Sequence, residues 1–209
     1  MAKEEDLGII MKALEWSYDK ALNGIPGFDS AADMAQEYLQ GSGTLHDKAN
    51  RLIRWQNTKA ATSGFITGLG GLVTLPVAIP ANLASVLYVQ IRMIAAIAQM
   101  GGHDVRSDQV KTMVYACLLG NAGKELIRNF GIQFGKQVAK NMIKSISGKT
   151  LTAINQKVHF RLITKFGEKG LINLGKAIPI VGGVVGGTVD LVATNAVGNI
   201  ARDVFIGEE

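Results

Sequence analysis

The stretch AATSGFITGLGGLVTLPVAIPANLASVLYVQI, residues 60–91, contains 32 consecutive residues without a formal charge. A run of about 18 or more apolar residues is typical of a membrane-spanning helix. Here Gly70, Gly71, Pro76 and Pro80 interrupt the run near its middle, and proline breaks a helix because it lacks an N–H donor and its ring clashes with the preceding turn. The stretch therefore predicts two shorter helices folded against each other, as a hairpin that is either buried or dips into a membrane.

Length and composition favour one domain of mixed character. The 209 residues suffice for one substantial hydrophobic core. Hydrophobic residues make up 47% of the chain, and the mean hydropathy of +0.19 is too low for a protein built mainly of membrane spans. The single cysteine, Cys117, excludes an internal disulfide framework, and the acidic first residues lack the pattern of a signal peptide. We therefore expect a cytoplasmic protein.

Charge is distributed unevenly along the chain. Residues 1–50 hold 4 lysines and 9 acidic residues, whereas residues 51–209 hold 18 basic and 8 acidic residues. The resulting charges of −5 and +10 favour contact between the second part and an anionic surface, a membrane or nucleic acid, although a solvated basic surface is an equal alternative. Aromatic residues are few and do not alternate with basic ones, which argues against nucleic-acid binding.

Helical periodicity extends over nearly the whole chain, and no alternating pattern predicts a strand. Ser30 with Asp33, and Thr44 with Asp47, place a hydroxyl three residues before an acid, a pattern typical of helix starts. We predict an all-α fold that forms one folding unit, with acidic amphipathic helices over 1–43 and a helical domain over 44–209. The other predicted helices cover residues 4–22, 81–100, 107–118, 121–146, 150–166 and 177–205.

Two sets of residues are candidates for membrane contact. Tryptophan is enriched where hydrocarbon meets water, and Trp55 lies where a basic helix enters the uncharged run. The first set is apolar and consists of Trp55, Phe65, Leu69, Leu72, Leu75, Val77 and Ile79. A soluble core is the alternative environment for these residues. Four-residue spacing places basic residues on one face of a helix, where they form either a surface for anionic headgroups or a solvated face. The second set is basic and forms two such ridges. Lys136, Lys140 and Lys144 form the first, and Lys157, Arg161 and Lys165 form the second.

Glycine clusters and two charges mark the apolar centre. Glycines four residues apart let helix backbones approach closely, and we expect this of Gly64, Gly68, Gly182, Gly183, Gly186 and Gly187. These clusters place two glycine- and proline-broken segments at the centre of the domain. Arg92 and Asp190 lie on the two apolar helices, and a buried charge needs a partner. The pair is one interpretation, and separate exposure to solvent is the other.

The motifs of catalysis and of cofactor binding are missing from the sequence. Residues 148–150 resemble the end of a phosphate-binding loop, but Ile143 stands where the motif requires glycine. The three histidines are more than 50 residues apart and show no metal-ligand spacing. We therefore expect no enzymatic activity, no catalytic or metal-binding residues and no cofactor.

Several apolar motifs together resemble one family. They are LIRWQ at 52–56, GFITGLGG at 64–71, TLP at 74–76, IPA at 79–81, QIRM at 90–93 and the late IP at 178–179. In number and order they resemble the EcsC family of bacterial proteins, over about residues 44–206. The late motifs are also similar to the helical domain that follows some bacterial membrane-associated GTPases, but this chain has no GTPase domain. The EcsC resemblance implies a hydrophobic, membrane-associated protein linked to an ABC exporter, without an agreed activity.

We therefore expect a membrane-associated helical protein at the cytoplasmic face of the inner membrane, peripheral or partly inserted. It would dock through the basic ridges and the apolar hairpin, and act by binding a membrane protein such as an ABC transporter or by perturbing the bilayer. The expected partners are anionic lipid, such a transporter and, through oligomerisation, further copies of the chain, but not nucleic acid. The alternative is a soluble all-α interaction module with a structural core or a lipid-sized apolar pocket.

Overall fold

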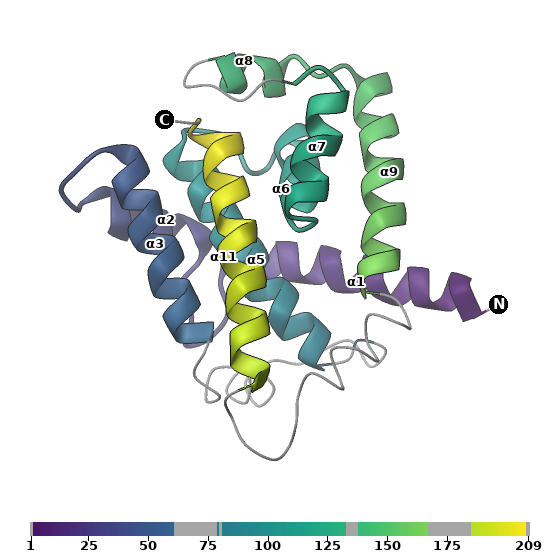
Figure 1. Ribbon diagram of the computed structural model, residues 1–209, viewed down its shortest axis with the longest axis horizontal. Helices are drawn as coiled ribbons and strands as arrows, with labels where there is room; N and C mark the ends of the chain where they lie inside the picture. The colour runs from purple at the N-terminus through teal and green to yellow at the C-terminus, as the bar shows by residue number, and fades with distance from the viewer. Residues whose placement is uncertain (1, 61–78, 80, 133–137, 167–184, 208–209) are drawn as a thin grey trace.

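The computed structural model describes residues 2–60, 79, 81–132, 138–166 and 185–207. These residues form nine α-helices and no β-strand (Figure 1), which confirms the prediction of an all-α fold. The helices are α1 (Ala2–Asn23), α2 (Ala31–Leu39), α3 (Leu45–Ala60), α5 (Ala81–Met100), α6 (Asp108–Cys117), α7 (Asn121–Asn129), α8 (Val138–Lys144), α9 (Gly148–Phe166) and α11 (Val185–Phe205). Both glycine- and proline-rich segments, 61–78 and 167–184, lie outside the described residues.

Local hydrogen bonds fix the starts of α2 and α3. The Ser30 hydroxyl accepts a hydrogen bond from the Asp33 N–H, and the Asp33 carboxylate accepts one from the Ser30 N–H, both at 3.2 Å. Thr44 and Asp47 form the same reciprocal pair at 3.1 and 2.9 Å. Each pair satisfies two of the N–H groups that would otherwise lack a partner at the start of a helix. Both predicted helix starts are confirmed.

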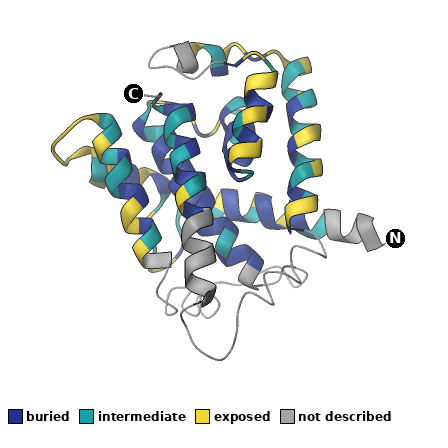
Figure 2. Ribbon diagram, in the orientation of Figure 1, coloured by how far each residue is buried: buried dark blue, intermediate teal, exposed yellow. Residues whose placement is uncertain are grey.

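Helix α5 forms the centre of the domain. It contacts α1, α2, α3, α6 and α11, and most of its side chains are buried (Figure 2). Within the described residues it is the one helix long and apolar enough to cross a membrane, over Leu83–Met100, and 89% of that window is buried inside the protein. A helix with apolar residues on most of its circumference suits such a core position.

Close backbone contacts place α11 beside α5. A Cβ atom added to Gly198 would lie 2.9 Å from Ile53 Cγ1 and 3.2 Å from Met93 Cε, so a larger residue would push these neighbours apart. Nearer the chain end, His103 Nε2 lies 2.9 Å from the Phe205 carbonyl oxygen. The two contacts put Gly198 level with Met93 and show that α11 and α5 run in the same direction.

The single helix predicted for residues 121–146 is wrong. Helix α7 ends at Asn129, and Gly131 follows with a φ of +77°. Glycine adopts this left-handed conformation without steric cost because it lacks a Cβ, so the chain turns there. Helix α8 begins only at Val138, and the first predicted basic ridge does not lie on one continuous helix.

Candidate functional site

Four helix termini that border the two apolar segments lie at the same end of the domain. Figure 1 shows the last turn of α3 and the first turns of α5 and α11 at the lower end of the described part, and the last turn of α9 higher up, beside α1 but still in the lower half. We call this end, defined by Ala60, Ala81, Phe166 and Val185, the segment end. Segments 61–80 and 167–184 therefore both leave and re-enter the described structure there.

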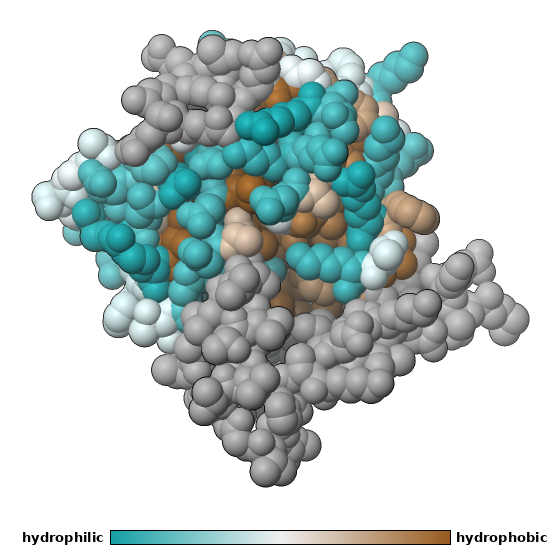
Figure 3. Space-filling view, viewed as in Figure 1, coloured by the Kyte–Doolittle hydropathy of each residue, from teal (hydrophilic) through white to brown (hydrophobic). Residues whose placement is uncertain are grey.

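Many of the predicted contact residues belong to those segments. Gly186 and Gly187 lie on the first turn of α11, and Ile79 is buried, with 5% of its surface exposed. The rest of the set lies outside the described residues, namely Phe65, Leu69, Leu72, Leu75, Val77, Gly64, Gly68, Gly182 and Gly183. On the face shown in Figure 3, hydrophobic side chains gather between α11 and α9 in the lower half of the described part, on the side of the segment end.

Two exposed aromatic residues lie near the ends of the helices that lead into the apolar segments. Trp55 is 50% exposed on α3 and Phe160 is 72% exposed on α9. A helix rises about 1.5 Å per residue, so Trp55, five residues before Ala60, is attached about 8 Å from the end of α3. Phe160, six residues before Phe166, is likewise attached about 9 Å from the end of α9. Each of the two helices thus presents one exposed aromatic ring within its last two turns.

Trp55 borders an open groove of about 510 Å³ between α2 and α3. The groove is also lined by Asp29, Glu37, Tyr38 and Arg51, so its walls are charged and aromatic. Burial, with a smaller effect of the Glu37 carboxylate, raises the pKa of Tyr38 to about 12, and its hydroxyl therefore stays protonated. This groove is therefore not the lipid-sized apolar pocket that one form of the soluble alternative predicts.

The second predicted basic ridge is used for contacts within the domain. Lys157 Nζ lies 5.0 Å from the centre of the Phe130 ring, and Arg161 Nη1 donates to the Ala122 carbonyl at 2.7 Å. Lys165 Nζ donates to the Leu118 carbonyl, at the end of α6, where a cation is favoured by the helix dipole. These residues hold α9 against the α6–α7 region.

The described part of the first predicted ridge lies away from the segment end. Helix α8, which carries Lys144, lies at the opposite end of the molecule from the segment end (Figure 1). Lys144 is exposed, Lys136 lies outside the described residues, and the side chain of Lys140 is not described. The ridge on α8 and the segment end therefore face different directions.

Arg92 is buried, with 3% of its surface exposed, against the loop before α2. Its Nη1 donates to the Asp29 carbonyl at 3.0 Å, and its guanidinium carbon lies 5.7 Å from the Phe28 ring centre and 5.3 Å from the Tyr88 ring centre. Stacking on aromatic faces stabilises a buried guanidinium. The charge thus has one carbonyl and two rings as neighbours among the described residues.

The predicted partner of Arg92 lies further along α11. Asp190 precedes Gly198 by eight residues, and its side chain is not described. Because Gly198 is level with Met93, the backbone of Asp190 lies about 12 Å further down the helix axis, towards the segment end. The described geometry does not bring Arg92 and Asp190 together.

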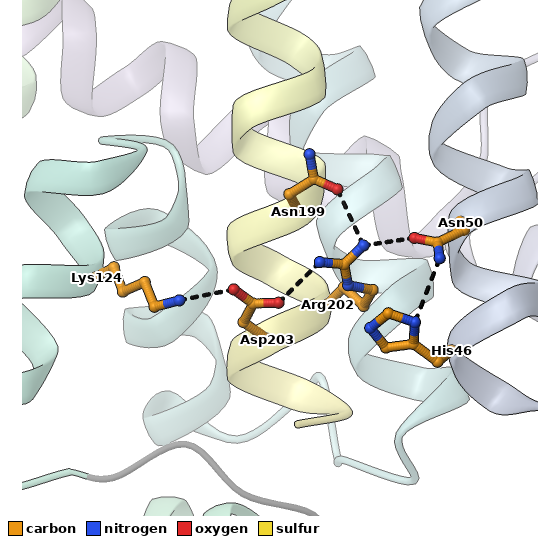
Figure 4. A network of polar contacts seen from close by, with 6 residues as sticks. All are labelled: His46, Asn50, Lys124, Asn199, Arg202 and Asp203. Carbon is orange, nitrogen blue, oxygen red and sulfur yellow. Dashed lines mark hydrogen bonds and ion pairs between the residues drawn. The ribbon is translucent and has the colours of Figure 1, made fainter. Parts of the chain in front are cut away.

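A network of polar side chains joins α7, α11 and α3 (Figure 4). Asp203 accepts from Lys124 Nζ at 2.7 Å and from Arg202 Nη2 at 3.0 Å. Arg202 Nη1 also donates to the side-chain oxygens of Asn50, at 2.5 Å, and Asn199, at 3.1 Å. All of these contacts are within the protein, and the network links three helices that are far apart in the sequence.

The described residues offer little chemistry for catalysis. They contain no group of three His, Cys, Asp or Glu side chains that are placed to hold a metal ion. Cys117 is fully buried, and burial raises the pKa of its thiol, so the reactive thiolate does not form at neutral pH. One polar cleft, between α1, α6 and α9, was not indicated by the sequence because its residues come from three distant helices.

Comparison with known proteins places the chain in a family. The model of the EcsC protein family matches residues 11–206, so the match includes most of α1 and all of α2, beyond the region 44–206 in which the motifs lie. No curated protein and no solved structure matches the chain at a significant level. Since the family match covers nearly the whole chain, this protein belongs to the EcsC protein family.

Proposed function

We propose that the protein binds the cytoplasmic face of a bacterial membrane through its segment end, with the apolar segments 61–78 and 167–184 entering the lipid. The observation that carries this proposal is the convergence of four helix termini at one end of the domain. Two segments that are separate in the sequence, each containing glycine and proline, are thus attached to the described helices towards the same end. A single approach to a membrane brings both of them to it.

The sequence of the segments suits such a contact. Residues 60–91 carry no formal charge, so their insertion does not require a charge to be removed from water. Arg54 and Lys59 precede the first segment, and the first ten residues of the second segment contain Lys169 and Lys176 against one acid, Glu168. Basic residues next to an inserted segment are attracted to anionic headgroups by about 1 kcal/mol each.

The exposed aromatic residues support the same orientation. Trp55 and Phe160 lie about 8 and 9 Å above the ends of their helices, and Arg54, beside Trp55, is exposed as well. Tryptophan is favoured at the level of the headgroups because its ring is apolar and its N–H is polar. Both rings would then lie near the interface, on the helices that lead into the inserted segments.

A soluble helical module is the second candidate. The burial of 89% of the Leu83–Met100 window favours it, because α5 is then an ordinary core helix. We reconcile this burial with the first candidate by assigning membrane contact to the segment end and leaving α5 inside the domain. In that arrangement the protein is peripheral, acts by holding a membrane protein such as an ABC transporter or by disturbing the bilayer, and needs no catalytic group.

Single-tryptophan variants test the proposal, since the chain has two tryptophans. Trp16→Phe leaves Trp55 as the probe, and Trp55→Phe leaves Trp16, which is partly buried on α1. With vesicles of phosphatidylethanolamine and phosphatidylglycerol we expect blue-shifted emission and quenching by brominated acyl chains for Trp55 alone. Absence of both changes for Trp55, or equal quenching of Trp16, would contradict this orientation.

A further inference from the structure

A polar cleft of about 370 Å³ lies between α1, α6 and α9, apart from the helix termini of the segment end. Glu15 comes from α1, Lys111 and Tyr115 from α6, and His159 from α9. Its size is at the lower limit of ligand pockets, which typically span about 300–1,000 Å³. The cleft thus has room for a small molecule and is lined by groups that form hydrogen bonds.

One part of the lining is fixed by contacts within the protein. Glu15 Oε2 lies 2.5 Å from Lys111 Nζ, and the Tyr115 hydroxyl donates to Glu15 Oε1 at 3.3 Å. Lys111 Nζ also lies 5.3 Å from the centre of the Tyr18 ring and 5.8 Å from that of Tyr115. Glu15 and Lys111 therefore neutralise each other and are held in place by two aromatic rings.

A second part of the lining has unused capacity. The side chains of Asp108, Asn155 and His159 make no hydrogen bond within the part of the chain that the structure describes. His159 lies with its ring 6.5 Å from that of Tyr115, and burial, opposed by Glu15 and reinforced by Lys111, lowers its pKa. The imidazole is therefore neutral at pH 7 and can both donate and accept.

Charge decides which ligand this lining accepts. With Glu15 and Lys111 paired and His159 neutral, Asp108 contributes the one uncompensated formal charge of the lining, and that charge is negative. A phosphate or carboxylate would face repulsion from Asp108, whereas an ammonium group would be attracted. Hydroxyl groups suit Asn155 and His159, since each of them offers one donor and one acceptor function.

We propose that this cleft binds a small amine that also carries hydroxyl groups, an amino alcohol or amino sugar, with its ammonium group on Asp108 and its hydroxyls on Asn155 and His159. The Glu15–Lys111 pair forms the wall on the α1 side, and the Tyr115 ring contacts the carbon skeleton. A phospholipid headgroup with the same amine is expected not to bind, because its phosphate would lie close to the uncompensated carboxylate of Asp108. The ligand is therefore a free amine, and the site acts independently of membrane binding.

Titration of the full chain with defined probes tests this proposal, with the ring resonances of His159 as the readout. Glucosamine and ethanolamine are expected to shift these resonances to saturation. Glucose, which lacks the amine, is expected to bind at least about tenfold more weakly than glucosamine, because it forms no charge-assisted hydrogen bond with Asp108. Glycerophosphoethanolamine and inorganic phosphate are expected to cause no saturable shift.

A pair of substitutions assigns the effect to the cleft. Asp108→Asn keeps the shape of the side chain and should weaken glucosamine binding at least about tenfold, while Glu125→Gln, an exposed acid on α7, should leave it unchanged. Equal binding of glucose and glucosamine, saturable binding of glycerophosphoethanolamine, or no saturation by any amine would overturn the proposal. The comparison of probes on the unaltered chain decides the matter even where a variant does not fold.

Discussion

Lys124 Nζ on α7 lies 2.7 Å from Asp203 Oδ2 on α11, in a pair whose side chains are 18% and 14% exposed. Arg202 is the second cation on the same carboxylate and reaches Asn50 on α3. Because water has little access to this group, its hydrogen bonds are stronger than those of a surface pair, and loss of one partner leaves a poorly solvated charge. The pair thus stabilises the packing of three helices.

Asp203→Ala should therefore destabilise the protein strongly. Removal of one member of a buried pair costs about 3 kcal/mol or more, and here two cations lose their carboxylate. Asp19→Ala is the matched control, since Asp19 pairs with Lys20 at the surface and such pairs contribute about 1 kcal/mol or less. Urea unfolding followed by circular dichroism measures both, and equal losses would show that the Asp203 network contributes no more than a surface pair.

Arg92 should couple energetically to Tyr88 and not to Asp190. Its guanidinium lies over the Tyr88 ring, whereas the α11 backbone places Asp190 about 12 Å away along the helix axis. In double-mutant cycles we expect a coupling of about 1–2 kcal/mol between Arg92→Met and Tyr88→Leu. The effects of Arg92→Met and Asp190→Asn should add, and a coupling above about 1 kcal/mol would restore the ion pair that the sequence suggested.

The helix caps make a contribution to stability that depends on pH. Hydrogen bonds from Ser30 hold the pKa of Asp33 below its ordinary value of 3.8, because they stabilise the carboxylate. The bond from the Ser30 hydroxyl has the larger effect and the bond from its N–H the smaller. A lowered folded-state pKa adds stability above the unfolded pKa, and this stability is lost as the pH falls through the folded value. The difference in unfolding free energy between the unaltered chain and Ser30→Ala should hence be largest above pH 5 and decrease below about pH 4. A difference that does not change between pH 7 and pH 3 would contradict this role of Asp33.

The fold was predictable where the signals are local. Ser30 with Asp33 and Thr44 with Asp47 mark helix starts within four residues, and the apolar composition of Ala81–Met100 marks the central helix. The break after α7 was missed because a single glycine is tolerated within a helical pattern. Only the observed φ of +77° at Gly131 shows that it ends the helix.

The sites were less predictable because their contacts are not local. Arg92 binds a main-chain carbonyl, that of Asp29, which any residue at that position supplies. The cleft combines Glu15 and His159, which are far apart in the sequence. They line the same cleft because α1 packs against α9. The close contact between Gly198 and Met93 could not be predicted either, because the sequence shows only a glycine within a helix.

Two sets of lysine and arginine substitutions distinguish the surfaces that could face the membrane. Arg54→Gln, Lys59→Gln and Lys176→Gln together remove two charges before the first apolar segment and one within the second, and should weaken binding to anionic vesicles by about 1 kcal/mol per charge. Lys136→Gln, Lys140→Gln and Lys144→Gln remove the same charge, and α8, which carries Lys140 and Lys144, lies opposite the segment end (Figure 1). This control should bind as the unaltered chain does. Weaker binding by the control alone would move the contact surface to α8.

The most direct test of membrane binding through the segment end is flotation of Leu75→Asp with vesicles of phosphatidylethanolamine and phosphatidylglycerol, together with its thermal unfolding. Leu75 lies near the middle of the uncharged run 60–91, and a charge there opposes insertion into lipid. We predict a variant with the helical circular dichroism and melting temperature of the unaltered chain that no longer floats with vesicles. A variant that loses its helical signal would contradict the account, because an unpaired charge would then have entered a buried core, and so would a folded variant that still floats.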